Sequence, residues 1–413
     1  MRTYVVVMAV VLGVGLALPG PLEPTLRFHS RRQAEPGLGD LIQEFALDIS
    51  SVSWSQQGNM VLSPFSITSL LSMLLLGTSG TTYHELRSAL LYPATAEDSA
   101  VHTSYQTLTR GLIQDKPGMI VSIANRLYLQ TGVNVLADFS QNAQRYYGIS
   151  VRELNFAQNP NGARNTINSW VNQETRGKIP RLLDFVSPQT TALAVNTVYF
   201  KGAWETPFLK RVTEIGTFNT GTQNISIPMM STMMKVPYLD LPDANAEMIA
   251  LPYQGRQFAM FFIVPRGPVT LNTLLELEFY LDADTLNRHI GSMRDVQMNV
   301  MVPRMSINFK TDLADTLKRL EVTSLFDSVR SDFSRMTTDK VLVDRVIHET
   351  VIDITEEGTE AAAATATDLN RIGTSRTFAV DRPALLFIRD LETRTPLFWG
   401  RLVEPEPLFD RNP

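Results

Sequence analysis

The residue types that most often carry catalysis are few in this chain and lie far apart. Its 413 residues include no cysteine, which excludes thiol nucleophiles, thiolate zinc sites and disulfide scaffolds. The five histidines are His29, His84, His102, His289 and His348. None of them has the HExxH spacing that places two zinc ligands on one face of a helix. We therefore expect no metal site and no cofactor.

Serine hydrolase chemistry also lacks its motif. There is no G-x-S-x-G nucleophile turn, and the nearest string, residues 77–80, is typical of the end of a helix. Glu356, Glu357 and Glu360 form a local carboxylate cluster, but no histidine or aromatic residue adjoins it in the sequence. Solvated charge is the default interpretation of such a cluster. Nothing in these patterns predicts an enzyme.

The composition is typical of a folded globular protein. Apolar residues make up 44% of the chain and charged residues 19%, and the formal net charge is -5. A protein that neutralises phosphates is normally basic, so we expect no nucleic-acid partner. Length alone allows about two or three domains.

The amino terminus has the pattern of a secretory signal peptide. Arg2 precedes an uncharged run over residues 4–18 that ends in small residues. About 15 apolar residues fall short of the roughly 20 that span a bilayer, so we expect no membrane anchor. We predict a signal peptide over residues 1–17 with cleavage between 17 and 20, a flexible arm over residues 18–39, and a secreted, extracellular protein.

Helical patterns begin at residue 40. Asp40 is suited to the N-cap of a first helix. Ser63 and Pro64 suit the start of a second helix, as a capping hydroxyl followed by proline. That helix is apolar on nearly all sides up to Gly77, which predicts that it is buried. Apolar stripes within residues 167–171 and 313–320 predict two more helices.

Strand patterns are interspersed with these helices. Runs rich in β-branched and aromatic residues predict strands at 190–200, 258–264, 296–302, 341–354, 384–388 and 397–403. A polar turn joins the last two, which predicts a hairpin. No internal repeat and no linker divides residues 40–405. We therefore expect one large α+β domain.

The segment from residue 356 to 367 is unlike the rest of the chain. Its alanines allow a short helix or a low-complexity surface loop. A period of two is the other interpretation, with Glu360 and Asp368 on one face. The opposite, uncharged face comprises Thr359, Ala361, Ala363, Thr365, Thr367 and Leu369. On that interpretation the segment could enter a sheet as a strand without burying a carboxylate.

Five segments, in order along the chain, resemble those of the serpins, the serine protease inhibitor superfamily. They are residues 59–67 (NMVLSPFSI), 196–204 (NTVYFKGAW), 302–305 (VPRM), 356–364 (EEGTEAAAA) and 396–401 (PLFWGR). The resemblance covers residues 40–404. It implies one large α+β domain with a central, mostly antiparallel sheet, additional sheets, surrounding helices and an exposed reactive loop over about 356–380. Residues 405–413 are expected as a short tail, and the protein as a monomer.

The resemblance also implies a mechanism. Serpins present their loop to a serine protease, and after cleavage and acylation the amino-terminal half of the loop inserts into the central sheet and traps the protease. The implied hinge of the loop comprises Glu356, Gly358, Thr359, Glu360, Ala361, Ala362, Ala363, Ala364 and Thr365. The protein is then an inhibitor that acts as a suicide substrate. A noninhibitory binding or carrier serpin is the alternative.

Two bonds compete as the implied cleavage site. The usual hinge length places the bond at Ile372-Gly373, where isoleucine suits a protease of elastase type. A hinge one residue shorter places it at Arg371-Ile372, and arginine is what the pocket of a trypsin-like protease selects. We favour Arg371, and therefore a trypsin-like serine protease as the covalent partner. Arg376 is a third candidate that lengthens the loop.

Motif matches also assign residues inside the fold. Ser63, Ser66, Asn196 and His348 resemble the polar cluster beneath the point where the central strands part. Arg304 and Glu356 occupy positions similar to a salt bridge at the top of the same sheet, and Trp204 is expected to pack nearby.

Two surface features complete the sequence-based expectations. Asn224 begins a glycosylation sequon, which in a secreted protein predicts a glycoprotein. The predicted helix over residues 99–112 carries Arg110 as its only base, so heparin binding is not indicated.

Overall fold

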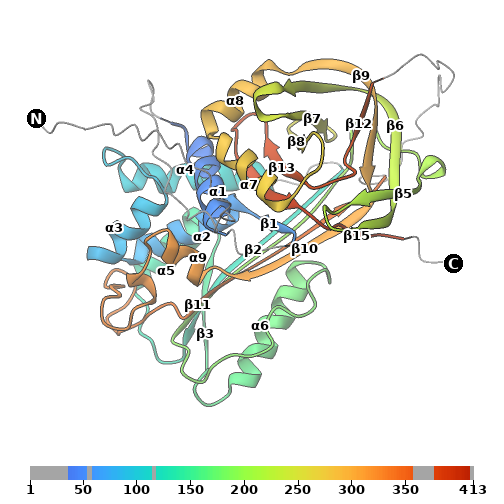
Figure 1. Cartoon of the computed structure of the whole chain (residues 1–413). Helices are drawn as coiled ribbons and strands as arrows, with labels where there is room; N and C mark the ends of the chain where they lie inside the picture. The colour runs from blue at the N-terminus through green and yellow to red at the C-terminus, as the bar shows by residue number, and fades with distance from the viewer. Residues whose placement is uncertain (1–35, 54–57, 114–117, 357–375, 410–413) are drawn as a thin grey trace, which may run out of the picture.

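The computed structural model describes residues 36–53, 58–113, 118–356 and 376–409 (Figure 1). The predicted signal peptide, most of the predicted arm, the hinge after Glu356 and both candidate scissile bonds lie outside the described residues. Within the described part of the chain, no helix is both long and apolar enough to cross a membrane.

A six-stranded sheet forms the centre of the described structure, in the order β15-β10-β11-β4-β2-β3. Its strands are β2 (Met119–Gln130), β3 (Ser150–Leu154), β4 (Ala192–Gly202), β10 (Met305–Asp312), β11 (Arg345–Ile354) and β15 (Glu406–Pro407). The pairs β4–β11 and β2–β3 are parallel and the others are antiparallel. Residues 405–413, expected as a tail, therefore begin with a strand of this sheet.

A second sheet of nine strands in the described chain has the order β1-β14-β13-β8-β7-β6-β9-β12, with β5 paired to β6. Its strands are β1 (Met60–Leu62), β5 (Glu214–Asn219), β6 (Asn224–Leu241), β7 (Ala246–Pro252), β8 (Phe258–Pro265), β9 (Arg294–Pro303), β12 (Thr377–Ala379), β13 (Ala384–Asp390) and β14 (Pro396–Leu402). The predicted hairpin is confirmed, because β13 and β14 pair antiparallel.

Most helices gather at one end of the long strands, whereas α6 lies apart from them beside the six-stranded sheet (Figure 1). The helices are α1 (Leu38–Val52), α2 (Pro64–Gly77), α3 (Gly80–Ala89), α4 (Asp98–Ile113), α5 (Ala137–Tyr147), α6 (Pro160–Glu174), α7 (Leu271–Tyr280), α8 (Ala283–Ser292) and α9 (Ala314–Arg319). Within the described ranges, three short 3-10 turns cover Lys210–Val212, Pro242–Ala244 and Ser324–Phe326. The expected α+β class, with one large domain and more than one sheet, is confirmed.

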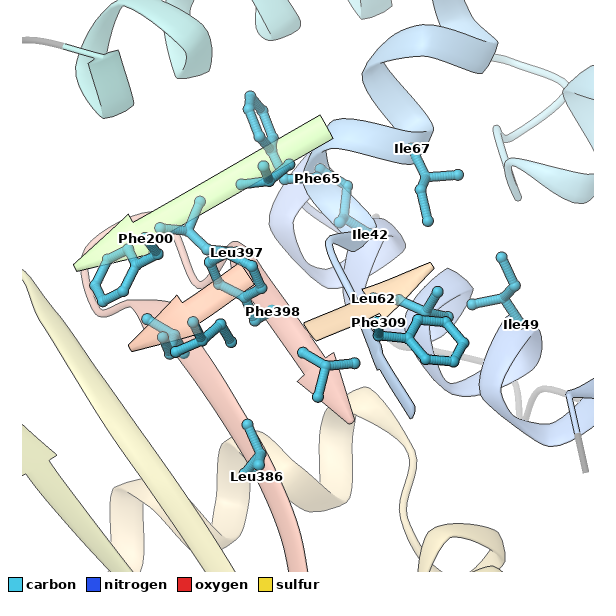
Figure 2. Packing of buried hydrophobic residues seen from close by; sticks show 14 of the residues in the cluster. Ile42, Ile49, Leu62, Phe65, Ile67, Phe200, Phe309, Leu386, Leu397 and Phe398 are labelled. Atoms are coloured by element: carbon cyan, nitrogen blue, oxygen red, sulfur yellow. The ribbon is translucent and has the colours of Figure 1, made fainter. Parts of the chain in front are cut away.

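The largest apolar core lies between the helices and the two sheets. Phe65 on α2, Phe200 of β4 and Phe398 of β14 belong to this core, and Figure 2 shows Leu62 of β1 beside Phe309. The rings of Phe200 and Phe398 pack edge to face with centroids 5.7 Å apart. The prediction that α2 is buried is confirmed, since every residue of α2 except Leu76 is buried.

Two boundaries differ from the sequence predictions. α1 begins at Leu38 with Gly37 as N-cap, because the Gly37 carbonyl already accepts the first helical bonds, so Asp40 is a first-turn residue rather than the cap. The strand predicted from residue 341 begins at Arg345, because the Val343 N–H instead donates at 3.1 Å to the carbonyl of Leu325 in a 3-10 turn.

The sequence patterns missed β6, the longest strand described. This 18-residue strand contains two prolines, Pro228 and Pro237, and several methionines. Proline removes a ladder donor and methionine is not a strong strand former, so the pattern did not predict a strand.

Candidate functional site

Two strands at the centre of the six-stranded sheet run side by side in parallel. β4 and β11 pair from Leu193 and Arg345 to Phe200 and Ile352, and we call this pairing the seam. β11 is also the last element before residues 357–375, and β12 is the first element after them. Side chains alternate across a sheet, so the seam has two faces with different neighbours. One faces the core that contains α2 and the other faces α6.

A buried histidine bridges the seam on the α2 face. His348 lies opposite Asn196 in the register, and both are fully buried. Its Nε2 accepts a hydrogen bond from the backbone N–H of Ser63 at 3.1 Å. The ring proton is therefore on Nδ1, which donates to Asn196 Oδ1. Burial lowers the pKa of His348 to about 3, so the ring is neutral near pH 7.

The amide of Asn196 extends this network to α2 and β2. Its Nδ2 donates to Ser66 Oγ at 2.6 Å and to Asn125 Oδ1. Ser66 Oγ in turn donates to Asn125 Oδ1 at 3.1 Å. The structure thus brings Ser66, Asn196 and His348 together and adds Asn125, which the sequence analysis missed. Asn125 shares a strand face with Ile123 and Leu127, which pack in the main core, and a polar residue on that apolar face is the signal that could have indicated it.

Ser63 enters this cluster through its backbone rather than its side chain. It is the N-cap of α2, but its hydroxyl makes no capping bond. Among the described residues, the buried Ser63 Oγ has no hydrogen-bond partner. The expected capping hydroxyl is therefore wrong. Pro64 does occupy the first turn, where a missing N–H is harmless.

A second group of contacts holds the carboxyl end of β11, just before residue 357. Arg304 Nε lies 3.1 Å from Glu356 Oε2, and the Glu356 side chain is 3% exposed. Thr213 Oγ1 donates to Glu356 Oε1 at 2.8 Å, and the Phe208 N–H donates to the Glu356 carbonyl at 3.0 Å. Glu356 is thus held through both its carboxylate and its backbone. The sequence analysis did not identify Thr213 or Phe208.

Trp204 spans the same end of the seam from the β4 side. Its Nε1 donates to the Thr355 carbonyl at 2.8 Å, and its ring stacks on Tyr253 with centroids 4.6 Å apart. The indole therefore ties the end of β4 to the residue that follows β11.

The described chain resumes at Arg376 beside a different sheet edge. The Arg376 carbonyl accepts the Asn299 N–H at 2.9 Å. Its guanidinium lies 4.1 Å from the ring centroid of Tyr238 and donates to the hydroxyl. This double attachment argues against Arg376 as the cleaved residue. The predicted loop also ends earlier than residue 380, because β12 begins at Thr377.

The remaining predicted site residues are not part of these networks. Asn224 is exposed at the start of β6. Gly358, Thr359, Glu360, the alanines 361–364 and Thr365 lie outside the described residues, as do Arg371, Ile372 and Gly373. Among the described residues, no group of three or more histidines or carboxylates is placed to hold a metal ion.

Comparison with known proteins identifies the class to which this fold and seam belong. The family model Serpin (serine protease inhibitor) matches residues 40–405. The chain belongs to the serpin family.

The relatives include named protease inhibitors. The chain is 36% identical to leukocyte elastase inhibitor of Equus caballus, over 84% of this chain and 93% of that protein. It is 32% identical to serpin B8 of Bos taurus, over 84% of this chain and 93% of that protein. Human thyroxine-binding globulin, solved with its ligand, superposes with a TM-score of 0.81 at 26% identity, over 89% of this chain and 98% of that chain. The family model and the relatives named as inhibitors support a serpin-type protease inhibitor.

The same relatives correct the predicted location. Leukocyte elastase inhibitor and serpin B8 are intracellular serpins, so the prediction of a secreted, extracellular protein is wrong. The run over residues 4–18 has the composition of a leader, but composition alone does not establish translocation. Glycosylation of Asn224 depends on the secretory route and loses its support with it.

Proposed function

We propose that this chain inhibits an elastase-like serine protease by loop cleavage, covalent trapping and insertion of the cleaved loop into the seam. The observation that carries the proposal is the direct parallel pairing of β4 and β11. A strand that turns back after β11 runs antiparallel to both of them, so it can add ladder hydrogen bonds on each side. The uncharged face that begins at Thr359 supplies side chains that can be buried there.

The trapping step is an acyl transfer. The protease serine Oγ attacks the carbonyl carbon before the scissile bond, the C–N bond breaks, and the proton passes through the protease histidine to the new amino terminus. An ester then links the loop to the protease. Insertion carries that ester away from the position where water would attack it, and the extra strand supplies the free energy.

We assign separate roles in the closed seam to the two groups of contacts described above. Ser63, Ser66, Asn196 and His348 keep the closed strands paired. Arg304, Glu356 and Trp204 hold the end at which insertion begins. The hinge is assigned to Gly358, Thr359, Glu360, Ala361, Ala362, Ala363, Ala364 and Thr365.

The choice of protease reverses the sequence-based preference. Several relatives are named leukocyte elastase inhibitors, and nothing in the comparisons supports a trypsin-like target. We therefore place the scissile bond at Ile372-Gly373, where the isoleucine fits an apolar pocket. Arg371 then precedes the residue that enters the specificity pocket.

Reaction with a panel of serine proteases tests this function. An elastase-type enzyme should form a complex that survives SDS, and mass spectrometry should find a released fragment that begins at Gly373. A fragment that begins at Ile372 would restore the trypsin-like assignment. Loop cleavage without any stable complex would contradict the inhibitory function.

The second candidate function is that of a noninhibitory carrier protein. Thyroxine-binding globulin has the same fold at a TM-score of 0.81, so the fold alone also serves a carrier. A carrier serpin would be cleaved by the whole panel without trapping any member of it.

A further inference from the structure

Asp353 is a hub on the α6 face of the seam. It lies on β11 just beyond the paired residues, and its side chain is 9% exposed. Ser306 Oγ donates to Asp353 Oδ1 at 2.9 Å, and Tyr199 Oη donates to Oδ2 at 3.3 Å. Lys178 Nζ lies 2.5 Å from the same Oδ2. One carboxylate therefore collects contacts from three different parts of the chain.

These partners differ in where they sit relative to the seam. Ser306 is on β10, which is the neighbour of β11 on the side away from the seam. Tyr199 is on β4 and faces Val351 in the register, so its bond to Asp353 crosses the seam.

Lys178 comes from the segment after α6, which covers the same face of the sheet. Ile179, Leu182, Leu183 and Val186 of this segment belong to one apolar cluster with Tyr199. The ammonium of Lys178 also lies 5.4 Å from the Tyr199 ring centroid. The ion pair with Asp353 thus attaches this segment, residues 178–186, to β11.

Insertion of a strand would break some of these contacts and leave others. Adjacent strands lie about 4.8 Å apart, so one more strand moves β4 and β11 to roughly 9.6 Å. The Tyr199 hydroxyl cannot follow Asp353 over that change. The bond from Ser306 survives, because β10 and β11 remain neighbours. The segment over residues 178–186, which covers the seam, must also shift. That shift strains the contact between Lys178 and Asp353.

We propose that Tyr199, Asp353 and Lys178 form a clasp that sets how fast the seam opens, and that they act as positioning residues for loop insertion. This proposal rests on the proposed function and specifies what limits it. A trapped protease escapes if it hydrolyses the ester before insertion is complete. The strength of the clasp therefore sets the ratio of trapped to released protease.

The contacts of the clasp exist only while the seam is closed. They stabilise the closed seam and are lost as it opens, so removing one lowers the barrier to opening. Loss of a single buried hydrogen bond of this kind should raise the insertion rate by about 5-fold. The same change should also shorten the lifetime of the uncleaved, closed form.

The experiment uses the full chain. Because the chain has no native cysteine, a single introduced cysteine can be labelled specifically. Asp368→Cys, on the predicted outward face of the loop, carries an environment-sensitive fluorophore that reports insertion. Insertion is timed after cleavage by a broad-specificity protease, and the trapped fraction is measured separately with an elastase-type enzyme. The variants are Tyr199→Phe and Lys178→Met. The matched control is Tyr128→Phe, since Tyr128 lies in the same apolar cluster but on β2, away from the seam.

The clasp predicts that Tyr199→Phe speeds insertion about 5-fold and that Lys178→Met speeds it by less, because the Lys178 side chain is 42% exposed. Both variants should raise the trapped fraction, while Tyr128→Phe leaves the rate and the trapped fraction unchanged. Insertion rates that match the control in both variants would overturn the clasp. If the parent chain inserts after cleavage but traps no protease, the inhibitory function fails while the rate comparison still decides the clasp. If the cleaved parent chain does not insert at all, both proposals fall.

Discussion

The seam and the neighbouring β13–β14 hairpin are both buried, but they are held by different interactions. Across the hairpin and its partner β8, the ring of Phe387 stacks between Phe261 and Trp399, with centroids 4.6 and 5.2 Å away. The seam is instead crossed by side-chain hydrogen bonds on both of its faces. Apolar stacking loses contact area with any separation, whereas polar groups can exchange one partner for another.

Two buried polar atoms without partners in the described chain also face each other across the seam. Thr197 and Glu349 lie opposite each other in the seam, and Thr197 Oγ1 and Glu349 Oε2 make no hydrogen bond with any described residue. Each such atom costs about 1–3 kcal/mol of stability. Among the described residues, the hairpin strands carry unpartnered atoms too, on Arg389 and Arg401, so their number does not separate the two regions. The difference lies in what crosses each pairing: stacked rings in the hairpin, and side-chain hydrogen bonds in the seam.

Truncating a buried side chain of the hairpin should give the largest loss of stability. Phe387 is fully buried, so Phe387→Ala should lower the free energy of unfolding by about 3–5 kcal/mol through lost packing and a cavity. Urea titration of the uncleaved chain measures this loss. A loss below about 1 kcal/mol would mean that the hairpin does not depend on its stacked rings.

Acid should cause the second-largest loss of stability, through the buried histidine of the seam. The pKa of His348 is lowered from 6.5 to about 3 in the fold, so the stability it contributes is present above pH 6.5 and is lost as pH falls toward 3. The slope is at most about 1.4 kcal/mol per pH unit. Unfolding by urea between pH 7 and pH 4 measures it, with His348→Gln as the control that should flatten the curve. Parallel curves for the two chains would refute this role of the histidine.

Removing the charge of Glu349 should have a smaller effect with the opposite sign. Burial raises the pKa of this carboxyl above 4.5, so its contribution is fully present below pH 4.5 and is lost as pH rises through the folded value. Glu349→Gln should therefore stabilise the chain at pH 7, by less than the acid effect of His348, and change little at pH 4. Thr197→Val tests the facing position. Destabilisation by Glu349→Gln at pH 7 would show that the carboxylate has a partner it needs.

A hinge substitution should have the smallest effect on stability although it abolishes inhibition. Thr359→Arg puts a cation on the first buried position of the inserting strand, where it has no partner. The uncleaved chain should unfold within about 0.5 kcal/mol of the parent, but the protease should cleave it and leave. Thr359→Ser is the matched control. Undiminished trapping by the arginine variant would contradict the hinge assignment.

Local patterns predicted much of this fold and part of the seam. The apolar α2 with Pro64 at its start and the β13–β14 hairpin follow from spacing and composition that are visible within a few residues. The position of His348 beside Asn196 entered through the family resemblance rather than through any local pattern.

The rest depends on register between distant strands, which no local pattern contains. Asn125 joins the histidine network because it lies directly opposite Asn196 in the pairing of β2 with β4. The clasp joins Lys178, Tyr199 and Asp353, and each of these residues looks ordinary in its own segment. Such contacts become visible only once the strand order is known.

Thermal unfolding of the chain before and after loop cleavage tests the central claim most directly. If the seam opens and accepts the loop as a strand, the cleaved chain gains ladder bonds and buried area, so its unfolding midpoint should rise by tens of degrees. Cleaved Thr359→Arg should show little or none of that rise. An unchanged midpoint in the cleaved parent chain would show that the seam stays closed and would contradict the account.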